Sequence, residues 1–287
     1  MTHAVRLVDV VAELEALYDP RCAESWDAVG LVCGDPDARI HRVLLAVDPV
    51  GVVADEALEW GADLLLVHHP LLLRAVHGVP ATDPKGQIVH RLITGGIALY
   101  VAHTNADVAN PGVSDALARR LGLIRTRPLA PSQNDPHGRQ GLGRVGELPV
   151  AVSLRGFTER AAAAIPATAG GLRVAGDPDQ TIRTVAVCGG SGDSLFDAAR
   201  AAGADVFITA DLRHHPASEF REHGGPALVD AAHWATEWPW LADAASDLED
   251  AGRARSATVE TRVSARVTDP WTFATTEDTS AARQSRS

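Results

Sequence analysis

Cysteine is scarce in this chain: its 287 residues include three, Cys22, Cys33 and Cys188, and no two of them have CxxC spacing. An odd and widely spaced set argues against both a disulfide framework and a zinc site made of thiolates. We interpret all three as buried thiols in a reducing cytosol, which predicts a cytoplasmic protein.

Lysine is scarcer still, since Lys85 is the only one, and no GxxxxGK[ST] string occurs. A Walker-type nucleotide site is therefore not expected. The 26 basic and 37 acidic side chains give a net charge of -11, which argues against nucleic-acid binding through phosphate neutralisation. The sequence also lacks a signal-peptide pattern and the roughly 18 consecutive apolar residues of a membrane span, so no membrane association is expected.

An internal duplication stands out in what the chain does contain. Residues 43–67, VLLAVDPVGVVADEALEWGADLLLV, align without gaps to residues 185–209, VAVCGGSGDSLFDAARAAGADVFIT. Each copy has the pattern of an apolar strand, a turn, a helix closed by Gly, and a second apolar strand. A further apolar strand follows each copy, at 96–102 and 225–232. The pattern predicts an α/β fold with two duplicated lobes.

The expected domains follow from this duplication. Residues 1–127 form the first α/β lobe, and residues 128–268 form the second lobe with the last metal-ligand motif. The polar, non-periodic residues 269–287 are expected to be a disordered tail.

Histidines and carboxylates follow the predicted strands. His68 and His69 end the run LLLVHHP, and the third strand of each half leads into a His-x-x-x-acid motif, HTNAD at 103–107 and HWATE at 233–237. Ligands of open α/β sheets gather at the carboxyl ends of the parallel strands. Nitrogen and oxygen donors without sulfur suit Zn, Mn or Fe(II), and a set this large suits two ions that share a carboxylate. The donors concerned are His68, His69, His103, Asp107, His233 and Glu237.

Several of these positions have alternative interpretations. His103 could orient a ligand, carry a proton during catalysis or cap the strand end. A second pair, His214 and His215, follows Asp211 out of register with the first pair. We interpret these three as groups that line the pocket or contact the ligands, rather than as ligands. The glycine-rich CGGSGDS at 188–194 could hold a phosphate on its amides or serve only as a turn.

The chain resembles a known family, the GTP cyclohydrolase 1 type 2 homologues, also called Nif-three-like proteins. The resemblance covers roughly residues 5–268 and is carried by WDAVGLVCGD, VHHP, HTNAD, TADLRHH and AHWATE, in that order. Ala28, Ala232 and Thr236 depart from the usual family residues but are not ligands. The resemblance implies a Nif-three-like fold with a dinuclear site between its lobes, whose metal ligands are His68, His69, Asp107, His233 and a bridging Glu237.

The expected function is a dinuclear metal-dependent hydrolase that acts on a nucleotide or a phosphoester-type small molecule. His103 is the candidate catalytic proton carrier, and the cofactors are two divalent transition-metal ions, Zn, Mn or Fe. The family name implies opening of the guanine imidazole ring of GTP, and the resemblance implies rings of six chains, a homohexamer. The Trp-rich segment WATEWPW also suggests apolar surface that a partner chain would cover. The alternative is a non-catalytic metal-binding protein, either a metal-handling chaperone or an assembly scaffold.

Overall fold

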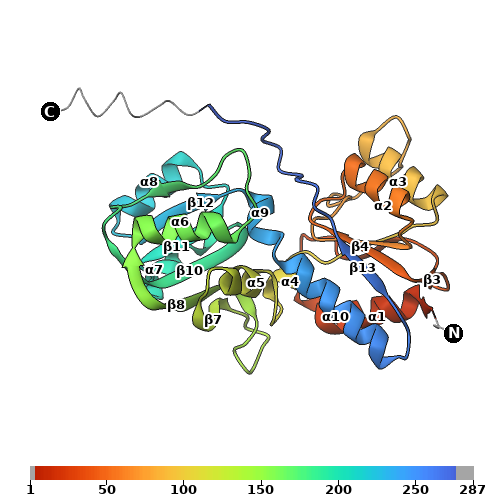
Figure 1. Ribbon diagram of the computed structural model, residues 1–287, viewed down its shortest axis with the longest axis horizontal. Helices are drawn as coiled ribbons and strands as arrows, with labels where there is room; N and C mark the ends of the chain where they lie inside the picture. The colour runs from red at the N-terminus through yellow and green to blue at the C-terminus, as the bar shows by residue number, and fades with distance from the viewer. Residues whose placement is uncertain (1–3, 276–287) are drawn as a thin grey trace.

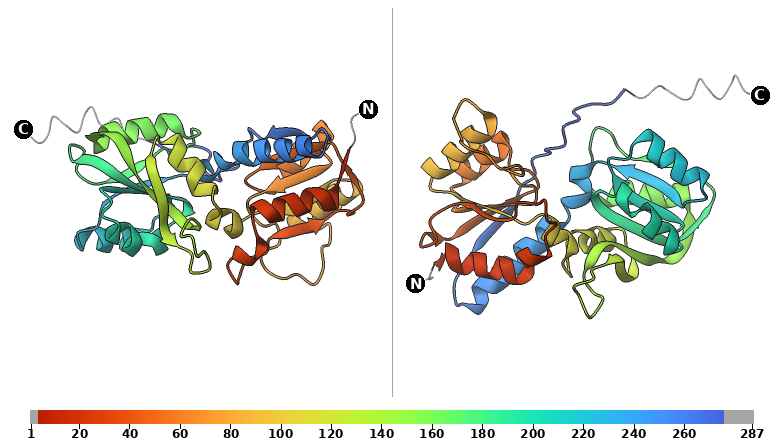
Figure 2. Two further views of the ribbon diagram at one scale, coloured as in Figure 1. Left: turned by 90° about the horizontal axis from the view of Figure 1, so that it is seen from below. Right: turned by 180° about the vertical axis from the view of Figure 1, so that it is seen from behind.

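The computed structural model describes residues 4–275, which form two α/β lobes that lie side by side (Figure 1). Each lobe is built on one mixed β-sheet with helices on both faces, as the views from below and behind also show (Figure 2). The expected fold class of two α/β lobes is confirmed. A short helix of each lobe, α4 (Thr104–Val108) and α9 (His233–Glu237), lies where the two lobes meet.

The first sheet has the strand order β13-β4-β5-β6-β2, in which β2 is antiparallel to β6 and the others are parallel. Every residue of the central strands β5 and β6 is buried, as expected where helices cover both faces of a parallel sheet. Helices α2 and α3 cover one face, and α1 and α10 cover the other. The bounds are α1 (Leu7–Leu17), β2 (Gly30–Cys33), β4 (Arg42–Ala46), α2 (Gly51–Trp60), β5 (Leu64–Val67), α3 (Pro84–Thr94), β6 (Ala98–Val101), α10 (Trp240–Ala254) and β13 (Glu260–Val263).

The second sheet has the order β7-β8-β10-β11-β12-β9, with a parallel centre of β10, β11 and β12. Helices α7 and α8 pack on one face, and α5 and α6 pack on the other. The bounds are α5 (Val113–Arg120), β7 (Ile124–Pro131), β8 (Gly141–Ser153), α6 (Leu154–Ala164), β9 (Arg173–Ala175), β10 (Thr181–Ser191), α7 (Phe196–Ala201), β11 (Val206–Ala210), α8 (His214–Glu222) and β12 (Ala227–Ala231). Outside both sheets, β1 (Val5–Arg6) pairs with β3 (Arg39–Ile40), and two 3₁₀ turns span Pro20–Cys22 and Asp193–Leu195.

The duplication read from the sequence is present in the structure. The series β4-α2-β5-α3-β6-α4 of the first lobe corresponds to β10-α7-β11-α8-β12-α9 of the second. Gly61 and Gly203 follow the first helix of each series with φ of +70° and +67°, the left-handed region that favours glycine. Equivalent strand ends in the two lobes therefore carry equivalent positions of the repeat.

The C-terminal part of the chain corrects the expected lobe boundary. Strand β13 pairs in parallel with β4, and α10 packs beside α1 through Tyr18 and Trp240, so residues 240–263 belong to the first lobe rather than to the second. The apolar positions of α10 explain this, because Leu241, Ala244 and Leu248 need a surface on which to be buried. Of the expected disordered tail, residues 269–275 form no helix or strand, and 276–287 lie outside the described residues.

A buried ion pair joins the second sheet to the α4–α5 connection. Arg144 of β8 is fully buried, and its guanidinium donates hydrogen bonds of 2.8 and 2.6 Å to the two carboxylate oxygens of Asp115. It also donates to the carbonyl groups of Gly141, Gly143 and Ala109. Since every one of these groups is satisfied, the pair fixes the position of the chain that leads out of α4.

The cysteines are only partly as expected. All three cysteines are free, but only Cys188 is buried, whereas Cys22 and Cys33 are half-buried near the protein surface. Among residues 4–275, no helix combines the length and the apolar character needed to cross a membrane.

Candidate metal centre

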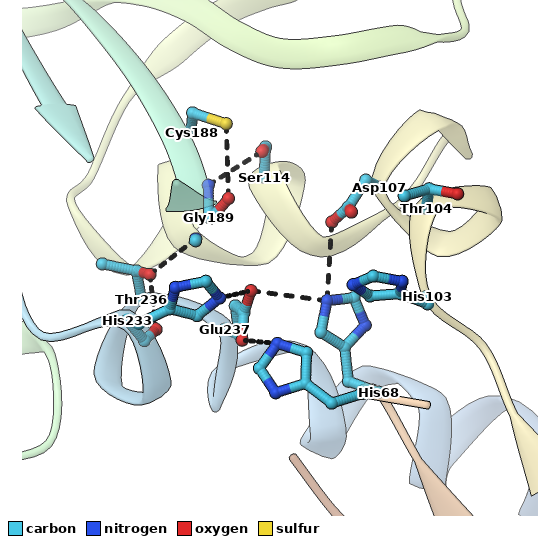
Figure 3. A network of polar contacts seen from close by, with 12 residues as sticks. His68, His103, Thr104, Asp107, Ser114, Cys188, Gly189, His233, Thr236 and Glu237 are labelled. Carbon is cyan, nitrogen blue, oxygen red and sulfur yellow. Dashed lines mark hydrogen bonds and ion pairs between the residues drawn. The ribbon is translucent and has the colours of Figure 1, made fainter. Parts of the chain in front are cut away.

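The histidines and carboxylates predicted from strand ends converge at the junction of the lobes (Figure 3). His68 and His69 follow β5, His103 and Asp107 come from the start and the body of α4 after β6, and His233 and Glu237 are the first and last residues of α9 after β12. The i,i+4 spacing puts His233 and Glu237 on one helix face, 2.9 Å apart between Nε2 and Oε1.

Glu237 lies at the centre of this group. Its side chain is 3% exposed, Oε1 is 3.5 Å from His68 Nε2, and Oε2 is 3.1 Å from His69 Nε2. Burial opposes the charge of Glu237, but His69, His233 and His68 hold its pKa well below the usual range. One carboxylate therefore faces imidazoles that come from both lobes.

Each imidazole is oriented by a hydrogen bond at Nδ1, which leaves Nε2 facing the centre. The acceptor for His68 is the carbonyl of Ala102, at 2.8 Å. Carboxylates hold the other three rings: Asp48 contacts His69 at 2.7 Å, Asp211 contacts His233 at 2.6 Å, and Asp27 contacts His103 at 2.8 Å. This arrangement of imidazole and outer acceptor is the one that metal-ligating histidines usually have.

The donor set fits a metal because several of its buried polar atoms have no hydrogen-bond partner in the chain. His68 Nε2, Asp107 Oδ1 and Glu237 Oε2 are buried and form no hydrogen bond. Buried polar atoms without a partner are unfavourable, and a cation among them would satisfy all three. Burial raises the pKa of Asp107 and outweighs the opposing effect of His68, so this carboxyl also lacks sufficient positive charge in the chain itself.

Two overlapping groups of donors lie close enough to hold ions. The ligand atoms of His68, His69 and His103 lie within 4.8 Å of one another, and so do those of His69, His233 and Glu237. His103 thus lies among the donors, as its place after β6 predicted. It directly precedes α4 but makes no side-chain capping bond to that helix.

The structure adds two carboxylates that the sequence interpretation did not single out. Asp48, which holds His69, follows β4, and Asp27, which holds His103, lies in the WDAVG segment. The position of Asp48 directly after the apolar run VLLAV was a usable signal, because it too lies at the carboxyl end of a parallel strand. Asp211 was expected to line the pocket, and it does so while contacting His233.

The glycine-rich segment at the end of β10 packs against the centre. The amides of Gly189 and Gly190 donate to the hydroxyl groups of Ser114 and Thr236, so these two amides are not free for a phosphate. His214 and His215, at the start of α8, belong to neither group of donors. A pocket of about 720 Å³ opens on the centre, with His69 and His233 in its lining.

Gly190 offers a direct test of the close packing around Glu237. A Cβ atom there would lie 2.5 Å from Glu237 Oε1 and 2.9 Å from His233 Nε2, at a φ of +67°. We expect Gly190→Ala to weaken metal binding by about tenfold or more, as removal of a group that orients a ligand does. Competition with a metal-sensitive dye measures the affinity.

Gly203→Ala is the matched control, because Gly203 has the same φ of +67° and no atom within 4 Å of its added Cβ. Both variants carry the backbone strain of about 1–2 kcal/mol, and only Gly190→Ala displaces ligands. Equal metal affinity in the two variants would contradict the packing described here.

Comparison with known proteins identifies the family. The sequence profile of the family described as Duf34/NIF3 (NGG1p interacting factor 3) matches residues 5–270. A Streptomyces coelicolor protein named "GTP cyclohydrolase 1 type 2 homolog" is 58% identical over 93% of this chain and 94% of its own length. A Mycobacterium tuberculosis protein of the same name is 37% identical over 93% of this chain and 97% of its own.

Solved structures agree with the fold. A hypothetical protein from Staphylococcus aureus superposes with a TM-score of 0.87 at 28% identity, over 94% of this chain and 100% of the other. A Bacillus cereus protein related to NIF3 has a TM-score of 0.87 at 24% identity, over 95% and 100% of the two chains, and shows the fold alone. The resemblance read from the motifs is confirmed: the chain belongs to the Duf34/NIF3 family, among the GTP cyclohydrolase 1 type 2 homologs.

Proposed function

We propose that this chain is a hydrolase that holds two divalent transition-metal ions, Zn, Mn or Fe, and acts on a nucleotide or another phosphoester. The observation that carries the proposal is the pair of donor groups that share His69, which lie around a buried carboxylate at the edge of an open pocket. His68, His69, Asp107, His233 and Glu237 would hold the ions, with Glu237 between them.

The chemistry divides between the ions and the chain. Two bound ions would supply hydroxide near neutral pH and would stabilise charge on the attacked centre. The chain excludes bulk water, since His68 is fully buried and Glu237 is 3% exposed. Asp48 and Asp211 hold His69 and His233 in place, which fixes where a substrate meets the ligands.

His103 is the proposed proton carrier. Its Nδ1 contacts Asp27, whose second oxygen accepts from the amide of Thr104. Burial opposes the charge of Asp27, but His103 and Thr104 hold its pKa far below the usual range, so it remains a carboxylate that orients the His103 ring. An imidazole oriented by a carboxylate is the usual arrangement of a general acid and base.

The pocket favours an enzyme over the non-catalytic alternative, because a metal-handling chaperone or a scaffold does not need a cleft of 720 Å³ beside its ligands. The test is metal reconstitution followed by a screen of nucleotides and p-nitrophenyl phosphate. We expect two equivalents of metal and a turnover that a chelator abolishes. Two equivalents without turnover on any of these substrates would favour the metal-binding role.

Metal binding should release protons. Burial by itself would lower the pKa of His69 and His233, but nearby carboxylates have the larger, opposite effect. Glu237 and Asp48 raise the pKa of His69 to about 10, and Glu237 and Asp211 raise that of His233 to about 11. At pH 7 both rings are therefore protonated in the metal-free chain, whereas a ligand must be neutral, so binding should release about two protons. Affinity should consequently rise with pH throughout the neutral range and fall as the pH is lowered.

Calorimetric titration of metal into metal-free protein, in two buffers of different ionisation enthalpy, measures this release. A binding enthalpy that is independent of the buffer would contradict protonation of these rings.

We also propose a cytoplasmic protein that assembles as a homohexamer. The Trp-rich segment does not support assembly in the way expected, because Trp234 and Trp240 are 5% and 1% exposed within the single chain. The proposal rests on the family resemblance, and light scattering at micromolar concentration tests it. A mass of six chains is expected, and a mass of one chain would contradict it.

A further inference from the structure

The segment after β13 leaves the first lobe and passes toward the second (Figure 1), and its later residues line the pocket beside the candidate metal centre. Ser264 is 2% exposed, and its amide donates to the carbonyl of Leu45. Its hydroxyl donates to Glu56 at 2.6 Å, and its carbonyl accepts from the indole of Trp238 at 2.9 Å. The start of this segment is therefore fixed against both α2 and the residues that follow α9.

The next contacts lie at the metal centre itself. The hydroxyl of Thr268 donates to Asp48, the carboxylate that holds His69. Asp269 is 9% exposed. The path of the chain is thus set by contacts up to two residues before Trp271.

Trp271 and Phe273 then line the same 720 Å³ pocket that His69 and His233 line. These two side chains are 71% and 79% exposed, and neither pairs with another aromatic ring among residues 4–275.

We propose that Trp271 and Phe273 determine substrate specificity by stacking on a planar aromatic ring of the substrate, such as a nucleobase. This inference rests on the proposed function, since the hydrolysable end of the same molecule would lie at the metal centre. We call Trp271 and Phe273 the aromatic wall.

Most other charged groups of the pocket already have partners, and the exception is Asp269, whose Oδ2 is buried without a hydrogen bond. The aromatic wall differs from all of them in being exposed and apolar. Asp48 contacts His69, and Asp211 contacts His233. Asp230 accepts from both Arg173 and the amide of Leu212. Stacking on exposed aromatic rings is accordingly the recognition that this pocket offers away from the metal ligands.

The dimensions limit the class of substrate. A chain spans at most about 3.6 Å per residue, so the Cα atom of Trp271 lies within about 11 Å of that of Thr268, beside the ligands. Since this is an upper bound, a molecule as long as a mononucleotide can contact both places. The pocket volume lies in the range usual for small-molecule sites.

The test uses two probes that share a sugar phosphate and differ in the ring, guanosine monophosphate and ribose 5-phosphate. Their dissociation constants are measured by calorimetry on metal-loaded wild type, Trp271→Ala, Phe273→Ala and Trp271→Phe. We expect Trp271→Ala and Phe273→Ala to weaken binding of guanosine monophosphate about tenfold, which is the scale of one lost stacking contact, and to leave ribose 5-phosphate unchanged. Trp271→Phe should retain most of the affinity.

Val150→Ala is the control, because Val150 is 71% exposed, like Trp271, and lies outside the pocket lining. Equal wild-type affinity for both probes, or equal weakening of both in the variants, would overturn the inference. A drop in oligomer mass in Trp271→Ala without loss of discrimination would overturn it too, by showing a subunit contact. Absence of hydrolysis would count against the proposed function only, since the binding comparison would stand.

Discussion

Glu237→Gln is expected to lower metal affinity by more than about 100-fold, which exceeds the loss usually caused by removing a group that merely orients a ligand. The substitution keeps the shape of the side chain but removes the charge that faces His68, His69 and His233 at 3.5, 3.1 and 2.9 Å. Elemental analysis after gel filtration measures the metal that remains. Hydrolysis, if present in the wild type, should fall with it.

His103→Ala is the informative comparison. If His103 carries protons and binds no metal, this variant should retain both ions but lose turnover. Its ligand atom lies within 4.8 Å of those of His68 and His69, so the structure also allows a direct bond to metal. If metal content falls as far in His103→Ala as in Glu237→Gln, His103 is a metal ligand. The proposal that His103 carries the proton would then be contradicted.

Arg144→Met is expected to reduce the free energy of unfolding by about 3–5 kcal/mol, the usual cost of removing one partner of a buried ion pair. The substitution leaves the carboxylate of Asp115 buried without its charge partner, together with the carbonyl groups of Gly141, Gly143 and Ala109. Chemical denaturation of metal-free protein measures the change.

Arg183→Met is the matched control on the neighbouring strand β10. Arg183 pairs with Glu147 at 3.4 Å, and its side chain is 54% exposed, so its loss should cost less than about 1 kcal/mol. Destabilisation of similar size in the two variants would show that the buried pair contributes no more than an exposed one.

The parallel strands and their ligands could be predicted because their signals are local. Each lobe repeats an apolar strand, a helix and a closing glycine, and the chemistry follows directly after a strand, as with His68 after Val67. Ligands gather at the carboxyl ends of parallel strands, so the sequence alone predicts that His103 and His233 lie near His68.

What could not be predicted depends on contacts between distant segments. Nothing near Asp27 in the sequence indicates that it contacts His103, 76 residues later. Strand β13 has only four residues, with a pattern of exposed and half-buried positions, so its pairing with β4 is set by packing and not by its own sequence. The expectation that residues 240–263 belong to the second lobe differs from the structure for the same reason.

The late position of β13 has a consequence for how the molecule is made. The N-terminus of a chain emerges from the ribosome first, and domains generally fold as units during synthesis. The second sheet ends with β12 at Ala231, whereas the first sheet lacks an edge strand until residues 260–263 have emerged. The part of the molecule that is synthesised first is therefore completed last, and until then β4 lacks the neighbour that covers its outer edge.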